Sequence, residues 1–319
     1  MTDDRTGYGE GNDSNQDTSG FFSMTHAPSA VIVLALLALF HFQGNTTEVN
    51  SYGHSLFSWL IARWSDSTLS VGDYSHGWLI PCVSIFILWQ KRRELAAARK
   101  TTCWPALSII VLGLLLHWLG ARAQQPRLSI AAFIVLLYGI PFFLHGREIA
   151  RLILFPCVFL AFCIPMNFFD ELTAPLRQFA AFASVFLLNG LGVAVERSGS
   201  AIFSVPRGAF GFDVADPCSG IKSLLAMTAL TAGYAYLTQK LLWKRWTLFL
   251  SAIPLAIVGN VARIVSLVAV AQIWGSAAAM SFYHDYSGYV VFLVVVLSMI
   301  GVGNLLNRRP VRTPSPAPQ

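Results

Sequence analysis

Long apolar stretches alternate with short polar segments along this chain, and the polar segments hold most of the charged residues. Each stretch approaches the ~20 apolar residues that a helix needs to cross the hydrocarbon core of a bilayer. Membrane strands would instead show short segments of alternating hydrophobicity. The pattern therefore predicts membrane-spanning helices, with nine apolar runs at residues 27–42, 74–90, 101–121, 128–146, 152–169, 178–195, 223–239, 246 to about 275, and 286–307.

Both ends of the chain depart from this pattern. Residues 1–26 are polar, acidic and rich in glycine, serine and asparagine, which is typical of a disordered cytoplasmic tail. They lack the basic segment and the cleavage site of a signal peptide. Residues 308–319 are basic and proline-rich and are interpreted as a second cytoplasmic tail. Residues 27–307 are therefore predicted to form one transmembrane domain.

Composition supports an integral membrane protein, because 55% of the residues are hydrophobic and only 12% are charged, against roughly 25% charged in soluble domains. The net charge of +6 does not indicate a nucleic-acid partner, since the basic residues gather at the ends of the apolar runs. The five cysteines include no C-x-x-C pair, so neither a zinc site nor a disulfide framework is predicted. No motif indicates a metal or an organic cofactor.

Clusters of basic residues mark the cytoplasmic side of a membrane protein. If all nine runs crossed, the clusters after residue 239 would face the opposite side from the earlier ones. If residues 178–195 form a re-entrant or interfacial helix on the outer face, all clusters share one side. We therefore predict an all-α, polytopic helical bundle of about eight spans with both termini in the cytoplasm. The clusters are Lys91, Arg92, Arg93, Arg99 and Lys100; Arg147 and Arg151; Lys240, Lys244 and Arg245; and Arg308, Arg309 and Arg312.

This topology brings three polar residues to a similar depth. Cys218 begins the sixth span from the outer face, and His284 begins the last span from the same face. Arg263 lies about 16 residues from the cytoplasmic end of its span, or ~24 Å along an α-helix. The three residues are therefore expected near the outer face, each on a different span.

The segment 216–223 (DPCSGIKS) is where a reactive thiol is predicted. Asp216 suits an N-cap and Pro217 the first helical position, which would place Cys218 in the first helical turn. There the helix dipole favours a thiolate, and Lys222 shares the same helical face. Asp216 opposes this effect by adding negative charge, so the net effect on thiol ionisation is left open.

Arg263 is the only charged residue between Arg245 and Asp285. An arginine within a span costs roughly 2.5 kcal/mol or more near the bilayer centre, which indicates a functional role. Alternatively, its guanidinium reaches the outer headgroups and anchors the helix. Asn260 lies one turn earlier on the same helical face, as expected for a polar stripe toward the bundle interior.

Two interpretations are open for His284, which lies among aromatic residues: an interfacial anchor, or the general base for the Cys218 thiol. With Arg263 stabilising the oxyanion or holding the substrate carbonyl, the thiol and the imidazole would carry out acyl transfer through a thioester. Asp285 is a candidate for orienting the imidazole. His76, at the outer end of the second span, either lines the same cavity or lies at the membrane interface.

Several segments together resemble the exosortase/archaeosortase family, namely residues 216–223, 260–264 (NVARI), the late His284, 74–77 (YSHG) and 89–93 (WQKRR). The resemblance implies a multi-pass cysteine protease and transpeptidase of the bacterial inner membrane, with its active site facing the periplasm. It assigns the nucleophile to Cys218, with Arg263 and His284 completing the site. Supporting roles are expected for Asp216, Ser219, Lys222, Asn260, Asp285 and His76.

The resemblance also implies partners. Such enzymes process exported proteins that end in a short motif such as Pro-Glu-Pro, one transmembrane helix and a basic cluster, and they are associated with exopolysaccharide production. The loop 201–215 is interpreted as a short hairpin that binds the motif, or as a lid without substrate contact. A different class stays open, a transporter or a scaffold of polysaccharide export, in which Arg263 binds an anion and Cys218 has no catalytic role.

Overall fold

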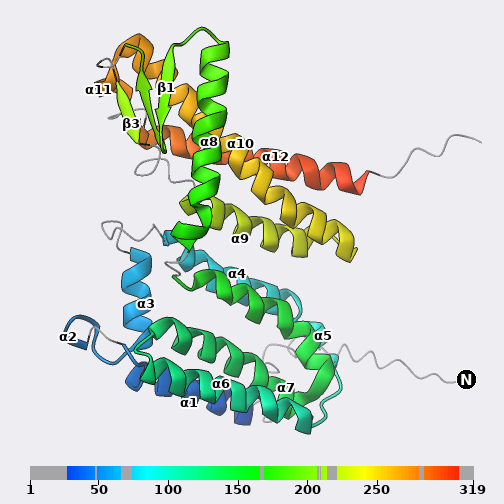
Figure 1. Cartoon of the computed structure of the whole chain (residues 1–319). Helices are drawn as coiled ribbons and strands as arrows, with labels where there is room; N and C mark the ends of the chain where they lie inside the picture. Colours follow the sequence, from blue (N-terminus) through cyan, green and yellow to red (C-terminus); the bar gives the residue numbers. More distant parts are fainter. Residues whose placement is uncertain are drawn as a thin grey trace, which may run out of the picture.

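The computed structural model describes residues 27–46, 49–65, 74–165, 169–206, 208, 210–213, 221–279 and 284–308. The described chain forms two helical groups, one after the other along the molecule (Figure 1). The first group comprises α1 (Ala27–Phe42), α2 (Val49–Tyr52), α3 (Leu56–Ser65), η3 (Ser75–Trp78), α4 (Leu79–Gln90), α5 (Arg92–Ala97), η4 (Trp104–Ala106), α6 (Leu107–Arg122), α7 (Pro126–Phe159) and η5 (Leu160–Cys163). The second comprises α8 (Phe169–Gly190), three strands, α9 (Ile221–Thr238), α10 (Leu242–Trp274), α11 (Ser276–Ala278) and α12 (His284–Asn307).

The helical membrane class predicted from the apolar runs is confirmed, but the predicted number of spans is not. α1 and α4 have 16 and 12 residues and are shorter than a typical bilayer-crossing helix. Among the described residues, four segments are long and apolar enough to cross a membrane: Trp104–Arg122, Pro126–Cys163, Leu242–Trp274 and Tyr286–Asn307. The chain is thus a multi-pass membrane protein. The number of eight spans stays a prediction.

α7 changes direction at Gly146, which separates the apolar runs predicted at 128–146 and 152–169. Gly146 has φ 84° and ψ −169°, a conformation that is nearly restricted to glycine. The carbonyl oxygen of Thr101 lies only 2.4 Å from the place that a Cβ at this position would take. The backbone amide of Thr101 also donates a hydrogen bond to the carbonyl of His145, at 3.2 Å. The kink therefore fixes the segment that leads into α6 against α7.

We expect Gly146→Ala to lower the free energy of unfolding by about 3 kcal/mol or more. The substitution combines backbone strain, which costs roughly 1–3 kcal/mol, with a collision against a backbone oxygen that cannot rotate away. Thermal unfolding of the detergent-purified protein measures the effect. Gly190→Ala is the matched control, because a Cβ there would meet open space. Equal unfolding temperatures for both variants would contradict the expectation.

A small antiparallel sheet interrupts the helical fold. It consists of β1 (Val195–Ser198), β2 (Ala201–Ser204) and β3 (Gly211–Asp213), in the order β1-β2-β3. The hairpin predicted within 201–215 is thus part of a three-stranded sheet that begins earlier. α8 also starts nine residues before the apolar run predicted at 178–195, and the end of that run belongs to β1. α8 is not among the four segments that qualify as spans in the described chain.

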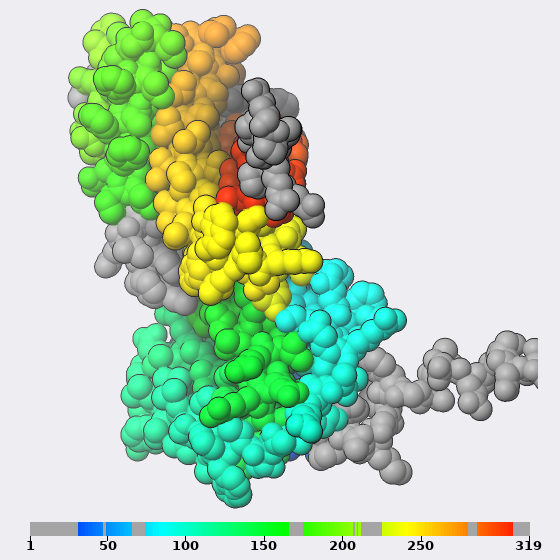
Figure 2. Space-filling model, turned by 90° about the vertical axis from the view of Figure 1, so that its right-hand side faces the viewer, coloured from blue at the N-terminus to red at the C-terminus, as the bar shows by residue number. Residues whose placement is uncertain are grey.

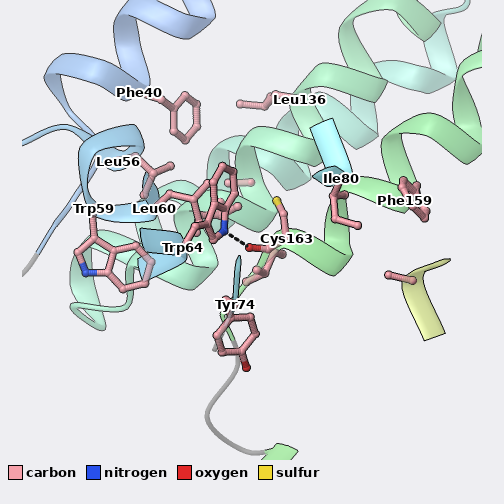
Figure 3. Close-up of a cluster of buried hydrophobic side chains, with 14 of the residues drawn as sticks. Phe40, Leu56, Trp59, Leu60, Trp64, Tyr74, Ile80, Leu136, Phe159 and Cys163 are labelled. Atoms are coloured by element: carbon pink, nitrogen blue, oxygen red, sulfur yellow. Dashed lines mark hydrogen bonds between the residues drawn. The ribbon is translucent and has the colours of Figure 1, made fainter. Parts of the chain in front are cut away.

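The first helical group packs around a cluster of buried side chains (Figure 3). The indole of Trp64 donates a hydrogen bond to the carbonyl of Cys163, at 3.0 Å. Gly77 lies directly against this indole, where a Cβ would come within 2.3 Å of Nε1. These contacts hold α3, η3 and η5 together. The cluster includes Phe40, Leu56, Trp59, Leu60, Tyr74, Ile80, Leu136 and Phe159.

In the second group, α9, α10 and α12 form a three-helix bundle (Figure 1). The hydroxyl of Thr231 lies 3.1 Å from the sulfur of Met299, which joins α9 to α12. Gly259 of α10 packs closely on Val295 of α12, with room for no Cβ. The C-terminal half of α10 packs instead against α8 and the sheet, through Ala180, Ala181, Leu188, Ile202, Ile264, Leu267, Val268 and Ala271.

The two groups meet at Tyr236 of α9. Its ring stacks on Phe155 of α7, with the centroids 3.7 Å apart and the planes 2° from parallel. The Nζ of Lys91 lies 5.1 Å from the centroid of the same ring, and the Cζ of Arg245 lies 4.7 Å from it. Figure 2 shows the corresponding contact between the yellow and cyan parts of the surface. One aromatic ring thus joins both groups and two basic clusters.

Two further contacts extend this basic end of the molecule. The backbone amide of Arg99 donates to Oε2 of Glu148, at 2.8 Å. The ammonium group of Lys244 donates to the carbonyl of Leu306, next to the last helical turn. Together with Tyr236, these contacts gather the described parts of all four basic clusters at one end of the bundle. The side of the membrane that this end faces stays a prediction.

Candidate functional site

Arg263 is the predicted site residue that the structure describes most fully. It lies in α10, beyond the middle of a helix of 33 residues. Its Nε lies 3.3 Å from the hydroxyl oxygen of Ser287 in α12, to which it donates a hydrogen bond. Its guanidinium also lies against Gly288, with Nη2 3.6 Å from the place that a Cβ would take. Arg263 thus packs on the first turn of α12.

His284 is the first residue of that turn. Positions three and four residues apart share one face of an α-helix, so position 284 lies on the same face as Ser287 and Gly288. Arg263 donates to Ser287, and its guanidinium faces the place that a Cβ at Gly288 would take. The structure therefore brings positions 263 and 284 together, although the side chain of His284 lies outside the described part of the chain.

The start of α9 lies at a similar level of the bundle. α9 and α10 are antiparallel neighbours joined by the short segment between Thr238 and Leu242. Ile221 lies about 17 residues before the end of α9, and Gly259 lies about 17 residues after the start of α10. Because both helices rise equally per residue, these two residues lie side by side. Arg263 is one turn beyond Gly259. The described part of α9 thus begins about one turn from the level of Arg263.

Cys218, Asp216 and Ser219 lie outside the described residues, and their predicted roles stay predictions. Lys222 belongs to the first turn of α9 and Asp285 to the first turn of α12, but their side chains also lie outside the description. α9 is described from Ile221 onward, and the helix start predicted at residues 216–218 lies outside the described residues. Of the helix positions predicted around the thiol, the structure thus describes only the backbone of Lys222.

Comparison with protein families adds a separate observation. Residues 64–301 match the family described as transmembrane exosortase. This match covers most of the chain, including Cys218, Arg263 and His284. The chain belongs to the exosortase family. No curated protein and no solved structure matches it.

Other positions in the exosortase chain take different places. Asn260 is half-buried in α10, one turn before Arg263 on a continuous helix, as predicted for a shared face. His76 lies in η3, where its ring is 5.7 Å from that of Tyr74 and the next residue packs on Trp64. These contacts of His76 belong to the core of the first helical group. His76 was expected either to line the same cavity as Cys218 or to lie at the membrane interface. Its described contacts support neither interpretation directly.

The remaining cysteines of the exosortase differ in exposure. Cys82 is exposed on α4, and Cys103 is half-buried before η4. Cys157 and Cys163 are buried. All four have free thiols. Within the described residues, no group of three His, Cys, Asp or Glu side chains has a metal-binding arrangement.

Sequence reasoning missed Ser287 and Gly288. Both lie in the segment that follows His284, and their spacing of three and four residues from it was a usable signal. A serine and a glycine are common in membrane helices, so the residue types alone did not distinguish them. The partner of Ser287 depends on how α12 is aligned along α10, which spacing within one helix does not specify.

Proposed function

We propose that this exosortase is a membrane-embedded cysteine endopeptidase and transpeptidase that cleaves the C-terminal sorting signal of exported proteins. The observation that most supports this proposal is the packing of Arg263 on the helical turn that begins at His284. This packing supports a shared location for two of the three residues expected for acyl transfer. The start of α9 at a similar level supports the addition of Cys218 to that location.

In the proposed reaction, the Cys218 thiolate attacks a peptide carbonyl after His284 has received the thiol proton. The carbonyl oxygen gains negative charge, which the guanidinium of Arg263 stabilises. The tetrahedral intermediate then collapses, and the imidazolium of His284 protonates the departing amine. The acyl group stays on Cys218 as a thioester. Water releases it as a carboxylic acid in hydrolysis, and an amine receives it as an amide in transpeptidation.

The proposed substrate is a protein tail with a short motif, one transmembrane helix and a basic cluster. If the basic end of the enzyme faces the cytoplasm, Arg263 and the start of α12 face the periplasm of a bacterial inner membrane. A substrate helix beside the bundle then presents the bond just outside its membrane segment to the site. Its own basic cluster lies on the cytoplasmic side. Machinery for exopolysaccharide production is the proposed wider partner.

Co-expression tests this function. A candidate substrate from the same genome carries one tag before the motif and a second tag after the basic cluster. We expect the enzyme to shorten the first tagged product and to separate it from the second tag. Exchange of the motif for alanines, with the transmembrane helix retained, is expected to prevent the change. Intact double-tagged product for every protein in the genome with such a tail would favour a transporter or scaffold.

A further inference from the structure

The first turn of α12 holds the guanidinium of Arg263 in a defined orientation. Nε lies 3.3 Å from the hydroxyl oxygen of Ser287, whose side chain is only 4% exposed. The Cβ position at Gly288 is 3.6 Å from Nη2, 3.7 Å from Cζ and 3.9 Å from Nη1. These three distances are nearly equal, so this position lies over the flat face of the guanidinium. Ser287 therefore binds Nε, and Gly288 leaves room for no more than a Cβ over one face of the guanidinium.

The hydroxyl of Ser287 has a partner on a different helix. The hydroxyl of Ser298, further along α12, donates to the carbonyl of Val294 in its own helix, and the residue is half-buried. Ser287 instead is buried and contacts a charged group on a different helix. A hydrogen bond to a charged group is stronger than one between neutral groups. The hydroxyl of Ser287 thus accepts a charge-assisted hydrogen bond from Arg263.

The orientation has a chemical consequence. A guanidinium offers five N–H donors in a fixed planar fork. When Nε is directed at Ser287 and one face is against Gly288, the edge formed by Nη1 and Nη2 lies away from Ser287. Nη1 and Nη2 carry the other four N–H groups, and the two that point along this edge have the parallel directions that one oxygen or a carboxylate requires.

We propose that Ser287 and Gly288 are positioning residues, which orient Arg263 so that its Nη edge meets the substrate oxygen that gains negative charge. This inference rests on the proposed function and assigns two residues to the same site. Preorganised donors stabilise a transition state because they need no reorientation during the reaction. Loss of the Ser287 contact therefore lowers turnover, and it leaves binding of the substrate's membrane helix unchanged.

A double-mutant cycle tests the role of Ser287. We expect Ser287→Ala to lower kcat about tenfold with KM unchanged, as for an interaction made in the transition state. In an Arg263→Lys background, which has no Nε, the same change is expected to have no further effect. Ser298→Ala is the control and retains wild-type kcat. Thermal unfolding of each detergent-purified variant shows whether it is folded.

Equal tenfold losses in both backgrounds would overturn the proposal, because Ser287 would then act without Arg263. Unchanged kcat in Ser287→Ala would overturn it as well. These outcomes are distinct from failure of the proposed function. That function fails if Cys218→Ser retains cleavage. If cleavage depends on Cys218 but the effects of the Ser287 and Arg263 variants are additive, the proposed peptidase activity stands and the positioning role of Ser287 does not.

A graded series at Gly288 provides a second measurement that does not depend on the hydroxyl. Gly288→Ala places a Cβ at ordinary contact distance from the guanidinium, so kcat is expected to stay within about twofold of wild type. Gly288→Leu needs the space that the guanidinium occupies, and a displacement of about 1 Å is expected to lower kcat ~100-fold. Gly301→Leu on the same helix meets open space and is the control. Full activity of a folded Gly288→Leu variant would overturn the proposal.

Discussion

Replacement of Cys218 by serine is expected to abolish cleavage, with a loss on the order of 10⁴-fold or more in kcat. A serine hydroxyl is far less acidic than a thiol, so a single imidazole activates it poorly in a site built for a thiolate. The oxygen is also a smaller and less polarisable nucleophile. The measurement is the appearance of the shortened substrate over time, with the variant present in the membrane at wild-type abundance.

Cys82→Ser is the matched control for this variant, because Cys82 is an exposed free thiol on α4. It is expected to retain wild-type cleavage. If Cys218→Ser cleaved as fast as Cys82→Ser, the nucleophile would not be Cys218. A thiol-blocking reagent gives an independent comparison, since it is expected to inactivate the wild type and to add nothing to the effect of Cys218→Ser.

Arg263→Lys is expected to lower kcat by about 10²–10³-fold while the charge of the chain is conserved. Removal of one donor to a developing oxyanion typically has an effect of this size. Lysine is a point charge on a flexible stem and has no planar fork. It also lacks an Nε donor for Ser287 and a flat face to lie against Gly288. Initial rates at saturating substrate measure the loss.

The control for Arg263→Lys is Arg197→Lys. Arg197 is exposed in β1 and donates from Nη1 to the carbonyl of Gly199. Its replacement is expected to leave kcat unchanged. Wild-type turnover in Arg263→Lys would instead favour the alternative in which Arg263 anchors α10 at the headgroups, because lysine fills that role equally well.

The helices were largely predictable from the sequence. An apolar run in a membrane must satisfy its backbone hydrogen bonds internally, and a helix does so within one segment. The boundaries were less predictable. The kink at Gly146 depends on the close approach of Thr101 from a different segment, which no local pattern reveals. The start of α8 at Phe169 was also missed. Its first turns contain Asp170 and Glu171, and these charges made the segment resemble a loop.

The candidate site was predictable in part for a different reason. Alternating spans bring Arg263 and position 284 to one end of the bundle, and the structure places them in one contact region. The contact itself depends on how α12 is aligned along α10, which the packing of Gly259 on Val295 sets. Sequence alone gives the depth of each residue to within a few turns. It does not specify which side chains of two helices face each other.

The length of α10 has a consequence for the charge of Arg263. Thirty-three residues extend about 50 Å, whereas the hydrocarbon core is about 30 Å thick. If Trp246 marks the cytoplasmic headgroups, the helix leaves the hydrocarbon core about one turn beyond Arg263. One face of the part beyond this level packs on α8 and the sheet. Arg263 would then lie where hydrocarbon on one side gives way to protein and water on the other. At such a dielectric boundary a cation keeps much of its hydration, and its field still extends into the apolar side.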